Sequence, residues 1–392
     1  MVYRSVYFEY TDRYVYRASD GLHIKGDSGG RQPLDRSCPA GSRVSNSAPH
    51  DRGVAVMRSL VYAGPGKVEW REAAEPVLQG DCEALVVPVA ASRCNFDIAM
   101  ISGEVPLRPP FPIGHEAVVK VVSIGDGVTS VRPGDIAVVV WHIACGGCDR
   151  CLRGMTGHCR QVPPGSSYGV GGPWGGLFDD LVRVPFADAM LTPLPAGIEP
   201  REFSSAGDGL GLGHAIVSRN MHPQPERVAV LGCGEHGLYQ VAFAVALGMP
   251  YVAYADQDPE RRSIAGSLGA HAVAASPDQL EGTFGLIIDV GANADWLYST
   301  IGMLEPEGVI ECVGGHFADM RLPGFLSYLN GATVRFGLGN NGPHVRPTID
   351  IVSQGLIRPS TIWAAEIDWD GLPEAFTAEP RKLVALRTQP TT

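Results

Sequence analysis

The sequence predicts an α/β protein in two parts, a β-rich part followed by a doubly wound parallel sheet with helices on both faces. Three observations lead to this prediction. Strand-like runs separated by Gly and Pro turns extend to about residue 198, strands and helices alternate from about residue 227, and a glycine-rich turn marks the first strand–helix junction of that alternation. The 392 residues, 45% of them hydrophobic, are enough for two or three domains with cores of their own.

The first part begins at Met57 and is rich in β-branched residues. Residues 118–124 and 135–141 are β-branched runs, and the turn Arg-Pro-Gly-Asp at 132–135 separates them, so both are expected to be strands. In the second part, strands are expected at residues 227–231, 251–255, 286–290, 309–313 and 333–336, and helices at residues 236–247 and 259–268. Gly248 is suited to end the first helix, and the pattern becomes irregular after about residue 344.

The glycine-rich turn reads Gly232-Cys-Gly234-Glu-His-Gly237 between an expected strand and an expected helix, which is the context of a Rossmann dinucleotide site. The first glycine permits the tight turn, the second lets the backbone approach the pyrophosphate, and the third allows close helix packing. The free N–H groups at the start of the helix are suited to bind the phosphates.

Asp256 ends the next expected strand and favours NAD(H) over NADP(H). A carboxylate there accepts hydrogen bonds from the ribose hydroxyls and repels a 2′-phosphate. Arg261 and Arg262 lie just beyond and soften that repulsion. The alternative role for Asp256 is to cap the helix that starts near Pro259.

Four cysteines lie within fifteen residues, at Cys145, Cys148, Cys151 and Cys159. Four thiolates at this spacing are typical of a structural Zn²⁺ site, since no coordination position is left for water. The alternative is a disulfide cluster or coincidental spacing. The other five cysteines are isolated from one another in the sequence, which indicates reduced, intracellular use and favours the cytoplasm.

The net charge of −11 argues against nucleic acid or an anionic membrane as a partner. We see no apolar run long enough to span a bilayer and no secretory signal. Residues 1–56 combine a tyrosine-rich start with a polar stretch, and we expect this extension to be disordered. We interpret it as an appendage or as the result of a misplaced translation start, and the alternative is a short regulatory arm.

The chain resembles the zinc-dependent medium-chain alcohol dehydrogenase superfamily from about Met57 onward. The resemblance rests on Gly-His-Glu-Ala at 114–117, the turn at 132–135, the cysteine cluster, the glycine turn and Leu-Glu-Pro-Glu-Gly at 304–308. It implies a GroES-like catalytic domain formed by residues 57–208 and 344–392, with the zinc lobe at 145–159, and a Rossmann domain at 209–343. It also implies a small-molecule substrate and a homodimer or homotetramer.

The same resemblance implies a second, catalytic Zn²⁺ held by Cys94, His115 and Asp208, as in secondary-alcohol, polyol and formaldehyde dehydrogenases. Three protein ligands leave one position for water or a substrate oxygen. Glu116 would enter this shell or support it from outside, and Asp97 would orient a ligand. The alternatives are a buried thiol for Cys94, a helix cap for Asp208, and Glu202 in place of Asp208.

One family feature is missing. The positions that usually carry a proton-relay hydroxyl and histidine are Phe96 and Ala99, which transfer no protons. Asn95, Glu116, His142 and His214 are the polar candidates to replace them, and His214 is equally compatible with a core histidine. Three functions therefore stay open: an NAD(H)-dependent dehydrogenase acting on an alcohol or carbonyl such as a polyol or sugar-like compound, a reductase of a conjugated C=C or C=N bond, and an inactive dinucleotide-binding homologue.

Overall fold

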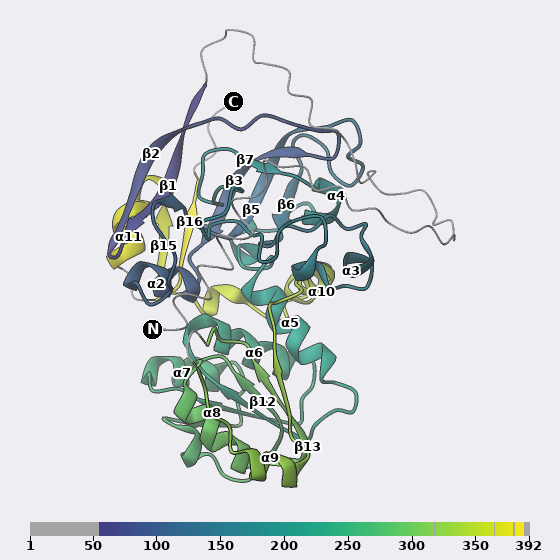
Figure 1. The fold of residues 1–392 in the computed structure, drawn as a ribbon, viewed down its shortest axis with the longest axis vertical. Coiled ribbons are helices and arrows are strands. Elements are labelled where there is room, and N and C mark those ends of the chain that lie inside the picture. The colour runs from purple at the N-terminus through teal and green to yellow at the C-terminus, as the bar shows by residue number, and fades with distance from the viewer. Residues whose placement is uncertain (1–54, 317–318, 364, 379–380, 388–392) are drawn as a thin grey trace, which may run out of the picture.

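The computed structural model describes residues 55–316, 319–363, 365–378 and 381–387. They form a β-rich lobe and a second lobe built on a parallel sheet (Figure 1). The α/β fold class expected from the sequence is confirmed. The expectation of disorder for residues 1–56 falls outside the described residues, apart from its last two positions.

The β-rich lobe contains two sheets. A seven-stranded sheet has the order β15-β16-β3-β5-β6-β8, with β7 paired to β3, and a three-stranded sheet has the order β2-β1-β4. The strands are β1 (Val56–Gly64), β2 (Lys67–Ala74), β3 (Ala84–Ser92), β4 (Phe111–Pro112), β5 (Glu116–Ile124), β6 (Ile136–Val139), β7 (Val182–Val184), β8 (Leu191–Pro193), β15 (Ala365–Asp368) and β16 (Leu383–Leu386). Both β-branched runs expected as strands appear, as β5 and β6.

The second lobe has a six-stranded parallel sheet in the order β11-β10-β9-β12-β13-β14. Its strands are β9 (Arg227–Leu231), β10 (Tyr251–Ala255), β11 (Ala272–Ala274), β12 (Phe284–Asp289), β13 (Leu304–Cys312) and β14 (Thr333–Phe336). Four of the five residues of β9 are buried, as expected for a central strand covered on both faces. The five expected strands are all present, and the short strand β11 is an addition.

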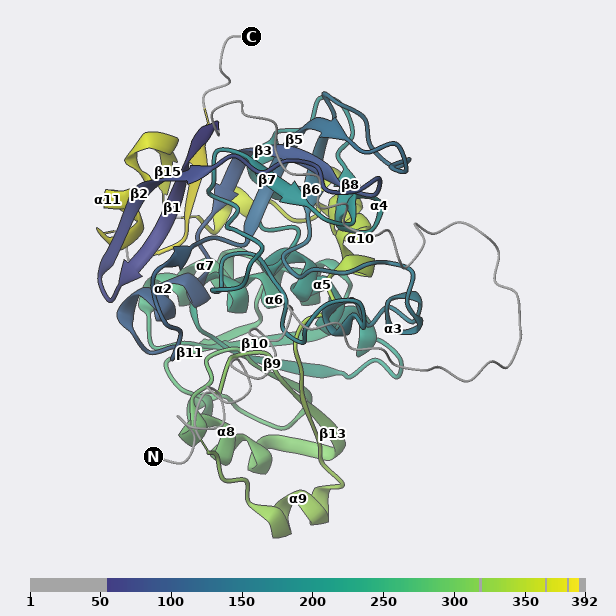
Figure 2. The ribbon, with the colours of Figure 1, turned by 45° about the horizontal axis from the view of Figure 1, so that its top comes forward.

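The helices are α2 (Asn95–Ser102), α3 (Asp149–Leu152), α4 (Ala187–Met190), α5 (Gly209–Arg219), α6 (Gly234–Ala246), α7 (Pro259–Ser267), α8 (Ala294–Thr300), α9 (Gly324–Asn330), α10 (Gly342–Ser353) and α11 (Leu372–Ala378). Helix α6 is buried on most sides because it packs on β9 and β10 on one side and on α5 and α2 on the other (Figure 2). Gly248 follows its C-cap residue with a φ of +81°, so the expected helix end is confirmed.

The expectation of irregular structure after residue 344 is wrong for its first part, which is helix α10. An internal Pro347 and a Gly-Pro start obscure the helical pattern in the sequence. The buried side chains Val345, Ile349 and Val352 nevertheless recur at helical spacing, and α10 packs along α5.

The chain returns to the first lobe after α10. Strand β16 pairs antiparallel with β3, and β15 pairs with β16 at the edge of the same sheet. Figure 1 shows this yellow C-terminal segment beside the purple strands β1 and β2, and α11 contacts β2. Lys382, just before β16, also lies 3.5 Å from Glu235 in the first turn of α6, so the C-terminal segment contacts both lobes.

Gly114 fixes the approach of the chain to β5, next to two candidate site residues: His115 lies just before the strand and Glu116 begins it. Its φ of +98° is a conformation that favours glycine, and a Cβ atom built there would overlap the ring of Phe178. Both the backbone angle and the close approach therefore require glycine at this position.

We expect Gly114→Ala to destabilise the protein more than Gly134→Ala. Gly134 has almost the same φ of +96° but no neighbouring atom within 4 Å of the added Cβ. Gly134→Ala should cost about 1–3 kcal/mol for the backbone alone. Gly114→Ala should cost about 1–3 kcal/mol more because the ring of Phe178 must move. Urea denaturation of both variants measures the difference, and equal losses would show that the core absorbs the methyl group freely.

Candidate functional site

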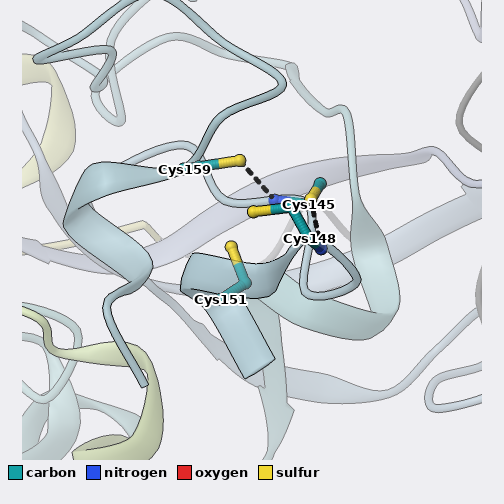
Figure 3. A group of neighbouring side chains, drawn as sticks. All are labelled: Cys145, Cys148, Cys151 and Cys159. Atoms are coloured by element: carbon teal, nitrogen blue, oxygen red, sulfur yellow. Dashed lines mark hydrogen bonds between the residues drawn. The ribbon is translucent and has the colours of Figure 1, made fainter. Parts of the chain in front are cut away.

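The four clustered cysteines meet in a lobe formed by α3 and its flanking loops. Their Sγ atoms all lie within 4.8 Å of one another and point toward a common centre (Figure 3). All four are free thiols, so the disulfide alternative is wrong for this cluster. Backbone N–H groups donate to the sulfurs: that of Cys148 lies 3.3 Å from Cys145 Sγ, and that of Cys145 lies 3.4 Å from Cys159 Sγ. Converging sulfurs with N–H donors fit a tetrahedral zinc site.

Cys94, His115 and Asp208 also come together, from three separate segments. Cys94 is the N-cap residue of α2, His115 immediately precedes β5, and Asp208 immediately precedes α5. His115 Nε2 lies 3.5 Å from Asp208 Oδ2, and all three residues are buried. Asp208 occupies the N-cap position of α5 without making a side-chain cap bond, because its carboxylate faces His115 instead. Glu202, the alternative to Asp208, is engaged elsewhere by the backbone N–H of Ser360.

Asp97 supports two of these residues from behind, as expected. Its Oδ2 accepts the backbone N–H of Cys94 at 2.9 Å, and its Oδ1 lies 3.3 Å from His115 Nδ1, although this pair is not aligned for a hydrogen bond. The contact with Asp97 at Nδ1 leaves Nε2 directed toward Asp208. A carboxylate behind a metal-binding histidine is the usual arrangement for holding the ring.

The electrostatics of the cluster favour a cation. Burial alone would lower the pKa of His115, but Asp97 and Asp208 outweigh it and hold the pKa well above its usual value. Burial would raise the pKa of Asp208, but the neighbouring histidines bring it down to about 2. Thiol, imidazole and carboxylate groups in a buried site of this character fit Zn²⁺.

Glu116 is held on the inner side of the same cluster. Its Oε2 accepts a hydrogen bond from Ser92 Oγ and forms an ion pair with Lys382 Nζ, both at 2.6 Å. Ser205 Oγ donates to it at 3.2 Å, and the backbone N–H of Gly209 donates to Oε1 at 3.3 Å. These contacts hold Glu116 close to Cys94 and Asp208, where it either supports the ligands or joins them.

The structure adds a histidine that sequence reasoning missed. His236 lies in the first turn of α6, and its Nε2 is 3.1 Å from Cys94 Sγ and 3.8 Å from Asp208 Oδ2. Cys94, Glu116, Asp208 and His236 form the group of four whose ligand atoms all lie within 4.8 Å, whereas His115 joins the site through its contact with Asp208. The signal in the sequence is the histidine inside the glycine turn, at a position that the dinucleotide motif does not specify.

The structure does not bring the relay candidate His214 to this cluster. Its Nδ1 lies 2.9 Å from His344 Nδ1, and its ring packs on Phe243. His142 is buried and hydrogen-bonded to Thr156 Oγ1 at 2.8 Å, and burial lowers its pKa to about 4. Phe96 directs its ring edge-to-face toward His115, at 6.2 Å between centroids, and brings no hydroxyl to the site.

The glycine turn joins β9 to α6 as expected. A Cβ on Gly237 would lie 3.1 Å from Gly232 Cα, which explains the need for glycine where helix and turn pack closely. No side chain caps α6 at Cys233, so the first N–H groups of the helix remain suited to phosphate. Gly234 has a φ of +54°, and the side chain of Asn95 packs against it from the other lobe, donating to the carbonyl of Cys233 at 3.0 Å.

Asp256 lies at the end of β10 next to this turn, but its carboxylate is already paired. Arg261 donates to both oxygens, at 2.8 and 2.9 Å, and Tyr254 Oη donates at 2.7 Å. The proposed role of Asp256 as a helix cap is wrong, since Asp258 caps α7 by accepting the N–H of Glu260. Arg261 therefore neutralises the charge that was expected to repel a 2′-phosphate.

A further group of possible metal ligands lies in the second lobe. Asp289, Cys312 and His316 meet at the carboxyl edge of the parallel sheet, with His316 Nε2 2.9 Å from Asp289 Oδ2.

Cys82 is in a disulfide, so the expectation of reduced thiols outside the zinc lobe is wrong for that residue, whereas Cys94 is free. Among the described residues, no helix is both long and apolar enough to cross a bilayer.

Comparison with known proteins places these features in a family. Residues 80–196 match the family model of the alcohol dehydrogenase GroES-like domain. A protein of Mycobacterium tuberculosis named as a probable zinc-binding alcohol dehydrogenase is 29% identical over 84% of this chain and 88% of its own length. The glutathione-independent formaldehyde dehydrogenase of Pseudomonas aeruginosa is 34% identical, but over only 52% of this chain and 55% of its own length.

The fold agrees with these relationships. The structure of an alcohol dehydrogenase from Thermus sp. ATN1 superposes with a TM-score of 0.77 at 28% identity, covering 85% of this chain and all of that one. With the cysteine lobe, the paired lobes and the sequence relatives pointing the same way, the chain belongs to the zinc-dependent medium-chain alcohol dehydrogenase superfamily.

Proposed function

We propose that this protein is an NAD(H)-dependent oxidoreductase that transfers a hydride between the cofactor and an alcohol or carbonyl compound, with a catalytic zinc held by Cys94, His115 and Asp208. The observation that carries the proposal is that these side chains meet in one buried site beside the first turn of α6. The relatives, which include alcohol dehydrogenases and a formaldehyde dehydrogenase, support this substrate class.

The chain's own residues account for binding and orientation. A zinc ion at this site would supply a Lewis acid toward a substrate oxygen. Asp97 holds Cys94 and His115, and Lys382 neutralises Glu116 behind them. The start of α6 is suited to hold a pyrophosphate close to the same site.

A second candidate is a reductase of a conjugated C=C or C=N bond. Phe96 favours it, because an aromatic ring stands next to His115 where an alcohol dehydrogenase of this family usually has a proton-carrying hydroxyl. Assays of hydride transfer with primary and secondary alcohols, aldehydes, ketones and enones separate the two candidates. Failure of all of them, with cofactor still bound, would favour the inactive homologue.

We expect His115→Ala to lose the catalytic zinc and at least about 10²-fold in activity while keeping the fold and the structural zinc. His222→Ala is the matched control, since His222 is an exposed histidine of the other lobe. Zinc content, circular dichroism and turnover with the best substrate are the measurements. A zinc-replete and active His115→Ala protein would remove this residue from the mechanism.

The four-cysteine lobe should hold a second zinc per chain, giving two in total. Cys148→Ser should reduce the content to one and lower the melting temperature, since binding of a structural zinc contributes to folding. Cys233→Ser serves as the control because Cys233 is exposed and outside both groups of sulfur ligands. Two zinc ions retained in Cys148→Ser, measured by mass spectrometry of the metal, would contradict the assignment.

The preference for NAD(H) depends on the Asp256–Arg261 pair. Asp256 supplies the acceptor for ribose hydroxyls, whereas Arg261 supplies a cation close enough to favour a 2′-phosphate. The two side chains therefore act in opposite directions on cofactor choice.

Arg261→Ala should widen the preference for NAD(H), and Asp256→Gly should narrow or reverse it. Each shift should be about 1–3 kcal/mol, the scale of a charge-assisted hydrogen bond, which corresponds to about 5- to 150-fold in the ratio of dissociation constants. Titration of each variant with NADH and with NADPH measures the two dissociation constants and therefore their ratio. Shifts in the same direction for the two variants would show that the pair acts as a unit and not through its separate charges.

A further inference from the structure

His236 is placed by the glycine turn but faces the candidate zinc ligands. It follows Glu235 in the first turn of α6, and 12% of its side chain is exposed. A residue at this place in a dinucleotide turn has no need of a titratable side chain, because the backbone N–H groups do the phosphate binding. The imidazole of His236 points away from the turn and toward a cluster of side chains that commonly bind metals. Phosphate binding therefore does not explain why a histidine is present at this position.

Two distances around His236 are close to those between ligand atoms of one tetrahedral zinc ion. Bonds of roughly 2.0–2.3 Å at a tetrahedral zinc separate neighbouring ligand atoms by roughly 3.3–3.8 Å. His236 Nε2 lies 3.1 Å from Cys94 Sγ and 3.8 Å from Asp208 Oδ2, and His115 Nε2 lies 3.5 Å from the same oxygen. The first separation is slightly shorter than this range and the other two fall within it, so a single ion fits between Cys94, Asp208 and His236 with small adjustments. His115 adjoins this group through its contact with Asp208.

The position of His236 is built into the fold and is not a free rotamer on a surface. Its neighbour Glu235 is anchored on two sides, by the backbone N–H of Asn95 at 3.0 Å and by Lys382 Nζ at 3.5 Å. These contacts tie the first turn of α6 to the β-rich lobe. A Cβ on Gly209 would lie 3.2 Å from His236 Cε1, so the backbone leading from Asp208 also packs on the ring.

From this geometry we propose that His236 is a direct ligand of the catalytic zinc, supplied by the dinucleotide turn in addition to Cys94, His115 and Asp208. The inference rests on the zinc site of the proposed function. A fourth protein ligand closes the tetrahedron, so a substrate must displace His236 or raise the coordination number to five. Zinc binding and cofactor binding are then linked, because the same helix turn serves both.

The test uses the full-length zinc enzyme. The four-cysteine site contributes only sulfur, so all imidazole scattering in zinc X-ray absorption comes from the catalytic site. The proposal predicts two imidazole rings per chain in the wild type and one in His236→Ala. Competition with a chelator should show that His236→Ala loses at least about 10²-fold in affinity for the catalytic zinc, since even supporting residues behind ligands are typically worth 10- to 100-fold. The control variant His222→Ala, which removes an exposed histidine, should change neither the number of imidazole ligands nor the affinity for the catalytic zinc.

The outcomes separate the inference from the function on which it rests. A wild type that binds only the structural zinc contradicts the proposed catalytic site itself. Two results would overturn the role of His236 and leave the proposed catalytic zinc site intact. One is a wild type with two zinc ions but only one imidazole ligand, and the other is a His236→Ala protein with unchanged affinity for the catalytic zinc. His236 would then be an ion-pair partner of Asp208. If His236→Ala does not fold, His236→Gln and the imidazole count of the wild type still decide between these outcomes.

Discussion

The arrangement of the whole site depends on one buried ammonium group, that of Lys382. Its side chain is 1% exposed, and it lies 2.6 Å from Glu116 and 3.5 Å from Glu235. Burial alone would lower the pKa of this lysine, but the two carboxylates hold it well above its usual value. The three charges come from the C-terminal segment, the start of β5 and the first turn of α6. Removing one partner of such a buried set typically costs about 3–5 kcal/mol, so the three segments must meet.

This constraint brings the dinucleotide turn against the metal-ligand cluster. Glu235 is fixed between Lys382 and the backbone of Asn95, and the next residue, His236, thereby reaches Cys94 and Asp208. Burial lowers the pKa of His236, but the thiol and carboxylates around it raise the pKa to about 10. The site therefore attracts cations strongly even though one of its charges is already balanced by the lysine. Such surroundings favour a divalent metal ion.

The departure from the family at Phe96 and Ala99 has a consistent structural context. Phe96 packs toward the ring of His115, and the polar side chains near the ligands belong to the group around Glu116, including Ser92 and Ser205. These hydroxyls lie within hydrogen-bond distance of one another and of Glu116. The hydroxyl groups closest to Glu116 thus lie on the side of Lys382, whereas the helix that follows Cys94 contributes the carboxylate of Asp97.

The sequence by itself determined the fold class, most strand positions, the four-cysteine lobe and the glycine turn, because short-range spacing and hydrophobic periodicity carry this information. It also placed Cys94, His115 and Asp208 as candidates, through the resemblance to a family, and the structure brings them together. The role of Asp256 was only half visible, because the sequence shows Arg261 nearby but not that its guanidinium occupies the carboxylate. Helix α10 was hidden by its proline and by its glycine-rich start.

Only the tertiary structure decided how residues far apart in the chain combine. Lys382 and Glu116 are separated by 266 positions, and His236 and Cys94 by 142. No local pattern marks such pairs, since each residue taken alone is an ordinary charged or polar side chain. These pairs form because buried charges must be neutralised where the two lobes pack together.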